Sequence, residues 1–473
     1  MTKATYCVKI LFITIPKGRK MNQNKEVLGT APVGRLLFKL ALPTVTAQLI
    51  NMLYNIVDRM FIGHIPEIGD LALTGVGVCL PMIMVVSAVA ALVGSGGAPR
   101  ASIAMGEKKI GEAEKILGNC FSLQIVISVI LTVILLVFNR PLLLAFGASE
   151  NTIEYACDYM NIYALGTIFV QLTLGMNAFV TAQGYSGVAM LSVVIGAVAN
   201  IGLDWLFVSG FGMGVKGAAF ATVLSQSFST AWILCFLFSK KAILRLKPSN
   251  MKLSEKVIFP CIGLGFAPFM MQASESVISA CFNTSLLDYG GDIAVGAMTI
   301  LSSVMQFAML PMNGVAQGAQ PILSYSYGAK NPERVKKTFR LLLVCCLTYS
   351  VLFWSFVMLF PRVLPSIFTT EAALIDFTAG VIRIYFGGLI IFGAQIACQM
   401  TFVSLGKALS SVTVAVMRKF VLLLPLIYIV PQFFDDKALG VYTAEPIADI
   451  LAVTFTVILF AFQFKKAIKN IEN

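Results

Sequence analysis

The strongest constraint on this chain is a series of apolar runs, each about 20 residues or longer, that follow one another from Leu36 onward. A run of this length can cross the hydrocarbon core of a bilayer as an α-helix, which satisfies its backbone hydrogen bonds within the segment. The pattern predicts an all-α polytopic membrane protein with about twelve spans, at 36–62, 71–97, 118–138, 159–182, 187–208, 216–238, 257–283, 292–322, 338–360, 377–404, 408–430 and 444–464.

The composition agrees with this fold class. Hydrophobic residues make up 58% of the chain and charged residues only 12%, whereas about a quarter of a typical soluble domain is charged. The net charge of +12 comes from bases in short connectors, so we expect a lipid bilayer and no nucleic acid as partner. These bases cluster after even-numbered spans, as at Lys108, Lys240, Lys330 and Lys407. By the positive-inside rule, both termini are expected in the cytoplasm.

The sequence lacks the residues that several kinds of chemistry require. The ten cysteines show no CxxC spacing, and His64 is the only histidine, so neither a structural metal site nor imidazole catalysis is indicated. No GxxxxGK[ST] loop is present for ATP. We therefore expect no enzyme, no catalytic residues and no cofactor, and any pumping must use an ion gradient. The run Leu11–Pro16 is too short for a span, and whether residues 1–20 belong to the mature protein is open.

The two halves of the chain repeat each other at an offset of 222 residues. With a small loop deletion, the first spans also align and pair Asp58 with Asn283. Repeats of six spans have the same orientation and predict two six-helix bundles related by a pseudo-two-fold axis along the membrane normal. We expect a cytoplasmic segment 1–35, lobes 36–238 and 257–465, a cytoplasmic linker 239–256 and a cytoplasmic tail 466–473. Identities at this offset are Gly96/Gly318, Pro99/Pro321, Ser102/Ser324, Gly106/Gly328, Lys108/Lys330, Lys115/Lys337, Tyr163/Tyr385, Gly166/Gly388 and Gly184/Gly406.

Two acids within the spans of the first lobe are candidates for function. Asp58 lies inside the first apolar run, where an ionised carboxylate costs about 2.5–3.5 kcal/mol and must face protein or water. The alternative is an Asp that reaches an interface or pairs with Arg59. Asp204 lies four residues after Asn200, so both face one side of the fifth span, as a cation-binding pair requires. The alternative for Asp204 is an interfacial position beside Trp205.

The sequence resembles the multidrug and toxic compound extrusion (MATE) family, in particular its branch of bacterial multidrug efflux pumps. The similar stretches are YNIVDRMFIG, GSGGAPRASIAMGEKK, ANIGLDWLF, VKGAAFAT, GAQPILSYSYGAKNPERVKK, RKFVLLLPLIYIVP and GVYTAEPIADIL. Together they cover nearly the whole chain from about Leu36 to Phe464. The resemblance implies twelve helices in two bundles and export of mostly cationic lipophilic compounds in exchange for protons or sodium.

The resemblance also implies an ion site in the first lobe. Asp58, Asn200, Asp204 and Thr222 match the ion-site residues of the family, and they would be the metal ligands if Na⁺ is the coupling ion. Tyr54 lies four residues before Asp58 on the same helical face. Without the resemblance, Asn200 and Thr222 would be interpreted as ordinary interhelical hydrogen bonds.

The second lobe offers a candidate for the substrate cavity. Glu275 lies in the seventh span, near where part of the family carries an acid, and the alternative is a structural pair with a base such as Arg383. The tenth span has no carboxylate, which argues against an ion site built there. Arg418 is expected to form a structural ion pair. Glu445 and Asp449 are equally consistent with a structural role and with a role in ion coupling. Other expected cavity residues are Gln48, Asn177, Gln183, Met271, Gln306, Met309 and Asn313.

The sequence thus predicts a secondary antiporter that exports cationic, lipophilic drugs by alternating access in the bacterial inner membrane, functional as a monomer. The residues do not distinguish H⁺ from Na⁺. A lipid-linked saccharide flippase of related architecture is the nearest alternative, although several cavity arginines would be expected for its pyrophosphate. A membrane enzyme or receptor without transport is a further alternative, against which the duplication argues.

Overall fold

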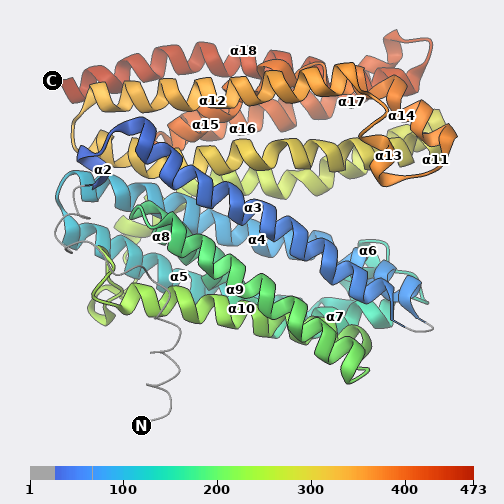
Figure 1. The fold of residues 1–473 in the computed structure, drawn as a ribbon, viewed down its shortest axis with the longest axis horizontal. Helices are drawn as coiled ribbons and strands as arrows, with labels where there is room; N and C mark the ends of the chain where they lie inside the picture. The colour runs from blue at the N-terminus through green and yellow to red at the C-terminus, as the bar shows by residue number, and fades with distance from the viewer. Residues whose placement is uncertain (1–26, 66–67, 473) are drawn as a thin grey trace.

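The computed structural model describes residues 27–65 and 68–472, and long helices account for most of them (Figure 1). No strand occurs within these described residues. Residues 1–20, whose place in the mature protein the sequence leaves open, lie outside the described residues. The elements are α2 (Val27–Thr30), α3 (Val33–Gly63), α4 (Gly69–Gly106), α5 (Ile110–Val137), α6 (Asn139–Ala145), α7 (Ile153–Leu165), α8 (Thr167–Ala182), α9 (Ser186–Asp204), η1 (Trp205–Gly210), α10 (Gly214–Phe238), η2 (Pro248–Asn250), α11 (Glu255–Gly328), α12 (Pro332–Leu359), α13 (Pro365–Phe368), α14 (Ala372–Tyr385), α15 (Leu389–Ser404), α16 (Ala408–Val416), η3 (Met417–Leu423), α17 (Leu424–Ile429), η4 (Val430–Phe433) and α18 (Lys437–Glu472).

Twelve spans can be assigned, as the sequence predicted. In the described part of the chain, nine helical segments are long and apolar enough to cross a membrane, and two bent pairs raise the number to eleven. The twelfth comes from α11, whose backbone leaves helical geometry at Gly291 with φ 65° and ψ −163°. Glycine tolerates this positive φ because it has no Cβ. Residues 255–290 and 292–328 therefore form separate spans.

Two predicted spans are broken rather than straight. α7 and α8 meet at Gly166 with a bend of 56°, and α14 and α15 meet near Gly388 with a bend of 55°. The helices also extend beyond several predicted limits. α4 continues to Gly106, α5 begins at Ile110 and α18 continues to Glu472, so the expected tail 466–473 is mostly helical. Hydropathy marks only the lipid-embedded part of a helix, whereas backbone hydrogen bonding continues into the polar flanks.

The repeat found in the sequence is present in the structure. Ser102 Oγ donates to the Ala182 carbonyl at 3.0 Å, and Ser324 Oγ donates to the Ser404 carbonyl at 2.8 Å. Each pair is separated by the same 80 residues. Lys108 and Lys330, also one offset apart, both adopt positive φ, of 63° and 53°. The two bundles thus have the same local geometry, as pseudo-two-fold symmetry requires.

The bundles contact each other most closely where small residues occur. A Cβ on Gly106 would lie 2.1 Å from the Tyr325 carbonyl oxygen, and one on Gly328 would lie 2.0 Å from the Ile103 carbonyl oxygen. Tyr325 and Ile103 are themselves one repeat offset apart, so the two contacts are related by the pseudo-two-fold axis. Only glycine permits this backbone approach between α4 and α11.

The connector between α10 and α11 is attached to the first bundle. Asn119 of α5 donates to the Asn250 carbonyl at 3.2 Å and accepts from the Ser254 N–H at 2.7 Å. Glu114 of the same helix pairs with Lys247 at 2.5 Å. Leu244 is fully buried in the core of the first bundle. The connector therefore covers one end of that bundle.

Candidate functional site

The predicted acids of the first bundle meet between two helices. Asp58 of α3 and Asp204 of α9 are close enough to share a hydrogen bond when one of the two carboxyl groups is protonated. Asn200, one turn before Asp204 on α9, is 1% exposed, and Asp204 is fully buried. The structure thus brings together three residues separated by up to 146 positions in the sequence.

These polar atoms have few partners in the protein. Asp58 Oδ1, both carboxylate oxygens of Asp204 and both amide atoms of Asn200 lack a hydrogen-bond partner among the described residues. Buried polar atoms are normally paired. Two facing carboxylates also repel each other, and a proton or a cation between them removes the repulsion. The donor set is all oxygen apart from the amide nitrogen, which suits either H⁺ or a hard cation.

Aromatic hydroxyls complete the cluster. Tyr54 of α3 and Tyr159 of α7 both lie within electrostatic reach of Asp58, and Tyr159 also lies near the Thr222 side chain of α10. Tyr163 stacks on Tyr159 with ring centroids 6.2 Å apart. Sequence reasoning placed Tyr54 and Thr222 here but missed the tyrosines of α7. Their i,i+4 spacing was the available signal.

A π-helical segment follows the cluster directly. η1 begins at Trp205, the residue after Asp204. Short π segments within α-helices are rare and occur frequently at functional sites. The second bundle has a longer π segment, η3, in the equivalent eleventh span, and it contains Arg418 and Lys419. Both bundles therefore depart from α-helical geometry next to their charged residues.

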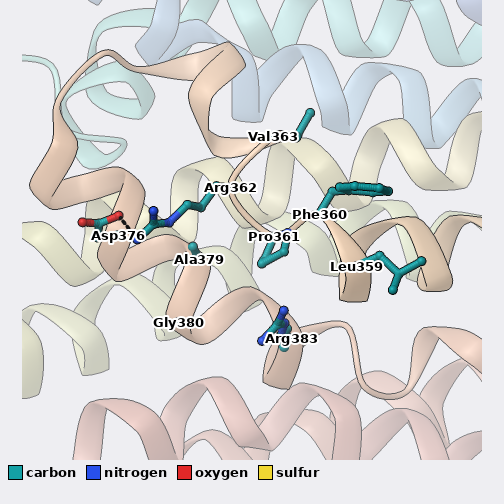
Figure 2. A pocket seen from close by; sticks show the side chains of 9 residues that line it. All are labelled: Leu359, Phe360, Pro361, Arg362, Val363, Asp376, Ala379, Gly380 and Arg383. Carbon is teal, nitrogen blue, oxygen red and sulfur yellow. Dashed lines mark ion pairs between the residues drawn. The ribbon is translucent and has the colours of Figure 1, made fainter.

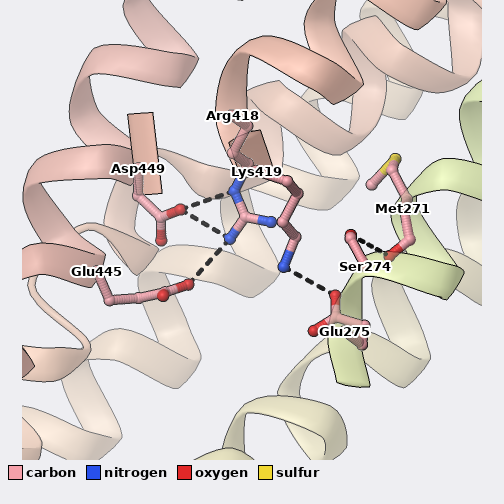
Figure 3. A network of polar contacts seen from close by, with 7 residues as sticks. All are labelled: Met271, Ser274, Glu275, Arg418, Lys419, Glu445 and Asp449. Carbon is pink, nitrogen blue, oxygen red and sulfur yellow. Dashed lines mark hydrogen bonds and ion pairs between the residues drawn. The ribbon is translucent and has the colours of Figure 1, made fainter. Parts of the chain in front are cut away.

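The second bundle holds a buried network of acids and bases (Figure 3). Arg418 Nε donates to Asp449 Oδ1 at 2.9 Å, and Nη2 contacts Glu445 Oε1 at 3.1 Å. The guanidinium also lies 4.5 Å from the centre of the Phe392 ring. The Arg418, Glu445 and Asp449 side chains are each at most 8% exposed. This confirms the structural pair predicted for Arg418.

Glu275 of α11 pairs with a base that the sequence did not indicate. Lys419 Nζ lies 2.8 Å from Glu275 Oε1, and Figure 3 shows the two side chains directed at each other. The suggested partner Arg383 was wrong, since its Nε donates to the Met358 carbonyl at 3.1 Å instead. Arg383 lies in the last turn of α14 and is engaged by the Met358 carbonyl, whereas Lys419 of the π segment η3 lies against Glu275 of α11.

The other expected cavity residues are dispersed. Gln48 Nε2 of α3 donates to Gln317 Oε1 of α11 at 3.3 Å, so it joins the two bundles. Gln183 is 2% exposed and accepts a hydrogen bond from the Leu244 N–H at 2.8 Å, so its side chain is bound to the connector between α10 and α11. Asn177 donates to the Ala189 carbonyl at 3.4 Å. Gln306 is exposed, and the half-buried residues are Met271, Met309 and Asn313.

A surface pocket of about 520 Å³ lies near the turn between α12 and α14 (Figure 2). Its lining includes Arg362 and Asp376, which form an ion pair at 3.0 Å with both side chains more than half exposed. Exposed pairs of this kind contribute little to stability. Its lining includes none of the residues of the Asp58 cluster or the Arg418 network.

Comparison with known proteins supplies the family context. The family model MatE matches residues 43–206 and 268–429. "Multidrug export protein MepA" of Staphylococcus haemolyticus is 22% identical over 89% of this chain and 92% of its own length, and that of Staphylococcus aureus is 21% identical over 85% and 88%. The solved structure "MATE in the bent conformation" superposes with a TM-score of 0.89 at 20% identity, over 97% of this chain and 100% of its own. "MATE in the straight conformation" gives 0.88 at 21%, over 95% and 100%.

Proposed function

The chain belongs to the MatE family, and we propose that it is a multidrug efflux antiporter that exports cationic, lipophilic compounds in exchange for H⁺ or Na⁺. Members of this family are membrane transporters rather than enzymes and need no cofactor. The names of the MepA relatives support the multidrug assignment. We place the protein in the bacterial cytoplasmic membrane as a functional monomer.

The observation that carries the proposal is the facing pair Asp58 and Asp204, neither of which forms an ion pair with a base among the described residues, although Arg59 lies within electrostatic reach of Asp58. Binding of H⁺ or Na⁺ neutralises the repulsion between the two carboxylates, with Asn200 and Thr222 as additional oxygen ligands. The neutral pair then permits α3 to pack differently against α9, which contributes to drug release. Moving one charge through 100 mV supplies about 2.3 kcal/mol for the cycle.

The proposed orientation follows from the basic connectors. With both termini cytoplasmic, Lys108 and Lys330 lie on the cytoplasmic side. The glycine contacts of Gly106 and Gly328 then close the cytoplasmic end of the interface between lobes 36–238 and 257–465. On this basis we infer that the described conformation is closed on the cytoplasmic side. The flippase alternative gains no support from Arg418, because two acids already neutralise its guanidinium.

The test is drug efflux in everted vesicles that carry Asp58→Asn or Asp204→Asn. Either change removes a carboxylate while keeping its shape, so we expect ion-driven ethidium transport to fall at least about tenfold. Asp70→Asn, at an exposed position at the start of α4, is the matched control and should leave transport unchanged. Undiminished ion-driven transport by both site variants would contradict the assignment of Asp58 and Asp204 as the ion-coupling site.

The identity of the coupling ion needs a separate measurement. Purified protein in proteoliposomes would be given a proton gradient or a sodium gradient, one at a time, and ethidium efflux would be followed by fluorescence. The gradient that drives efflux in the wild type but not in Asp58→Asn identifies the coupling ion. Efflux under neither gradient contradicts antiport itself.

A further inference from the structure

The polar network of the second bundle is related to the ion site of the first through one pair of repeat-equivalent tyrosines, Tyr163 and Tyr385. Tyr163 contacts the Asp58 cluster through Tyr159 and Tyr54. Its repeat partner Tyr385 lies within electrostatic reach of Glu445, Asp449 and Glu275. Each cluster also adjoins a π segment of the fifth span of its bundle. The two clusters therefore share an equivalent tyrosine and a neighbouring π segment, and they differ in charge content.

The difference lies in the bases. Among the described residues Asp58 and Asp204 form no ion pair with a base, and only Arg59 lies within electrostatic reach of Asp58, whereas the second bundle supplies Arg418 and Lys419 to three acids. Arg418 is shared by Glu445 and Asp449. Lys419 forms its ion pair with Glu275 and also lies within electrostatic reach of Glu445. At the repeat offset Lys419 corresponds to Ala197, about two helical turns before Asp204, so its ammonium group belongs to a different level of the helix than the acids of the first bundle.

The two members of the Glu275–Lys419 pair differ in exposure. The Lys419 side chain is 6% exposed, and the Glu275 side chain is 55% exposed. Glu275 also lies on the helix that contacts the other bundle, since the neighbouring Ser276 Oγ lies 4.0 Å from Met84 Sδ of α4. A ligand at the junction of the bundles can therefore reach the carboxylate while the ammonium group stays behind it.

We propose that Lys419 is a built-in counter-cation of Glu275 that competes with the positive group of a cationic substrate, and so determines charge selectivity. This inference rests on the proposed export of cations. In the empty transporter, Lys419 keeps Glu275 neutralised. A bound cation takes over part of this contact, and Lys419 then favours its release. Lysine suits the role because its flexible stem allows the ammonium group to withdraw.

The test is ethidium binding to purified protein in nanodiscs, followed by fluorescence. Lys419→Met keeps the length and apolar stem of the side chain, and the freed Glu275 carboxylate is exposed enough to be hydrated. We expect the dissociation constant for ethidium to fall about tenfold. The exposed Lys437, 5.4 Å from the Tyr289 ring, provides the control Lys437→Met, which removes the same charge and should have no effect.

A double-mutant cycle separates competition from general repulsion. Glu275→Gln should weaken ethidium binding about tenfold. Adding Lys419→Met to that variant should lower the dissociation constant by a smaller factor than Lys419→Met lowers it in the wild type. Equal tightening in both backgrounds would mean that Lys419 acts through the overall field, which overturns the inference. Unchanged binding in Lys419→Met overturns it too. Efflux of ethidium by the wild type, measured in parallel, tests the proposed function independently.

Discussion

The two bundles hold their buried acids in different surroundings. Asp58 and Asp204 face each other without an ion pair to any base in the described part of the chain, whereas Arg418 lies between Glu445 and Asp449 with both carboxylates within 3.1 Å. Two facing carboxylates need a proton or a cation to relieve their repulsion, whereas Arg418 offsets part of the charge of its two acids within the protein. The proposed coupling therefore uses the acids of the first bundle, and Arg418 stabilises the structure around it.

Removal of Arg418 should show how much this compensation contributes. Arg418→Met leaves two acids buried without a cation, so we expect a loss of about 3–5 kcal/mol in stability. Thermal unfolding in detergent measures the change as a lower midpoint. Arg362→Met removes an exposed pair with Asp376 and should cost less than about 1 kcal/mol. A similar midpoint for both variants would contradict the network.

At the scale of elements, the structure differs from the apolar pattern mainly at breaks. The pattern predicted the fourth and tenth spans as single helices, but both bend by more than 50°. It also gave no indication of η1 and η3, because π geometry is a choice among hydrogen-bonding partners rather than a change in hydropathy. These irregular segments adjoin the charged residues of both bundles. The two buried polar clusters therefore coincide with departures from regular helical structure.

The connector between the bundles gives a prediction at this scale. Asn119→Ala removes two of the three side-chain hydrogen bonds that hold residues 250–254, leaving that of Ser122 Oγ to the Met251 carbonyl. It also leaves the Ser254 N–H without this acceptor, at a cost of about 1–3 kcal/mol. We expect faster tryptic cleavage among Lys240, Lys247 and Lys256 in limited proteolysis of the solubilised protein. Asn151→Ala, at an exposed turn, is the control. An unchanged cleavage rate in Asn119→Ala would show that the core residues of the connector suffice to hold it.

At the scale of the whole molecule, the two bundles depend on pairs of equivalent glycines. Gly106 and Gly328 touch backbone carbonyls across the pseudo-two-fold axis. Gly96 and Gly318, also one offset apart, would place a Cβ 1.9 Å from the Cys261 carbonyl oxygen and 2.6 Å from the Ala41 Cα. Small residues thus set how closely the bundles approach at this end.

Gly106→Ala and Gly328→Ala should have similar effects, because symmetry makes their surroundings equivalent. Each added methyl group meets backbone rather than a movable side chain, so we expect a loss of about 1–3 kcal/mol and slower efflux. Thermal unfolding and ethidium efflux measure the two effects. Gly111→Ala, in open space on α5, should be neutral or slightly stabilising. A large effect at only one of the two equivalent sites would argue against a shared interface.

The sequence by itself determined the number of spans, the repeat and the acids of the first bundle. Length and hydropathy decide whether a segment crosses a membrane, and duplication leaves identities at a fixed offset. Asp58, Asn200 and Asp204 could be selected because an acid within an apolar span is costly anywhere. The motifs then suggested that they belong to one site.

Only the tertiary structure decided which charges meet. In the structure, Glu275 pairs with Lys419 rather than with Arg383. Tyr159 joins the Asp58 cluster, and the Gln183 side chain is hydrogen-bonded to the connector. Hydropathy and spacing determine the face of one helix but not its rotation against helices far away in the chain. That rotation depends on the packing of small residues and on breaks such as η3, and it determines whether a buried charge has a partner.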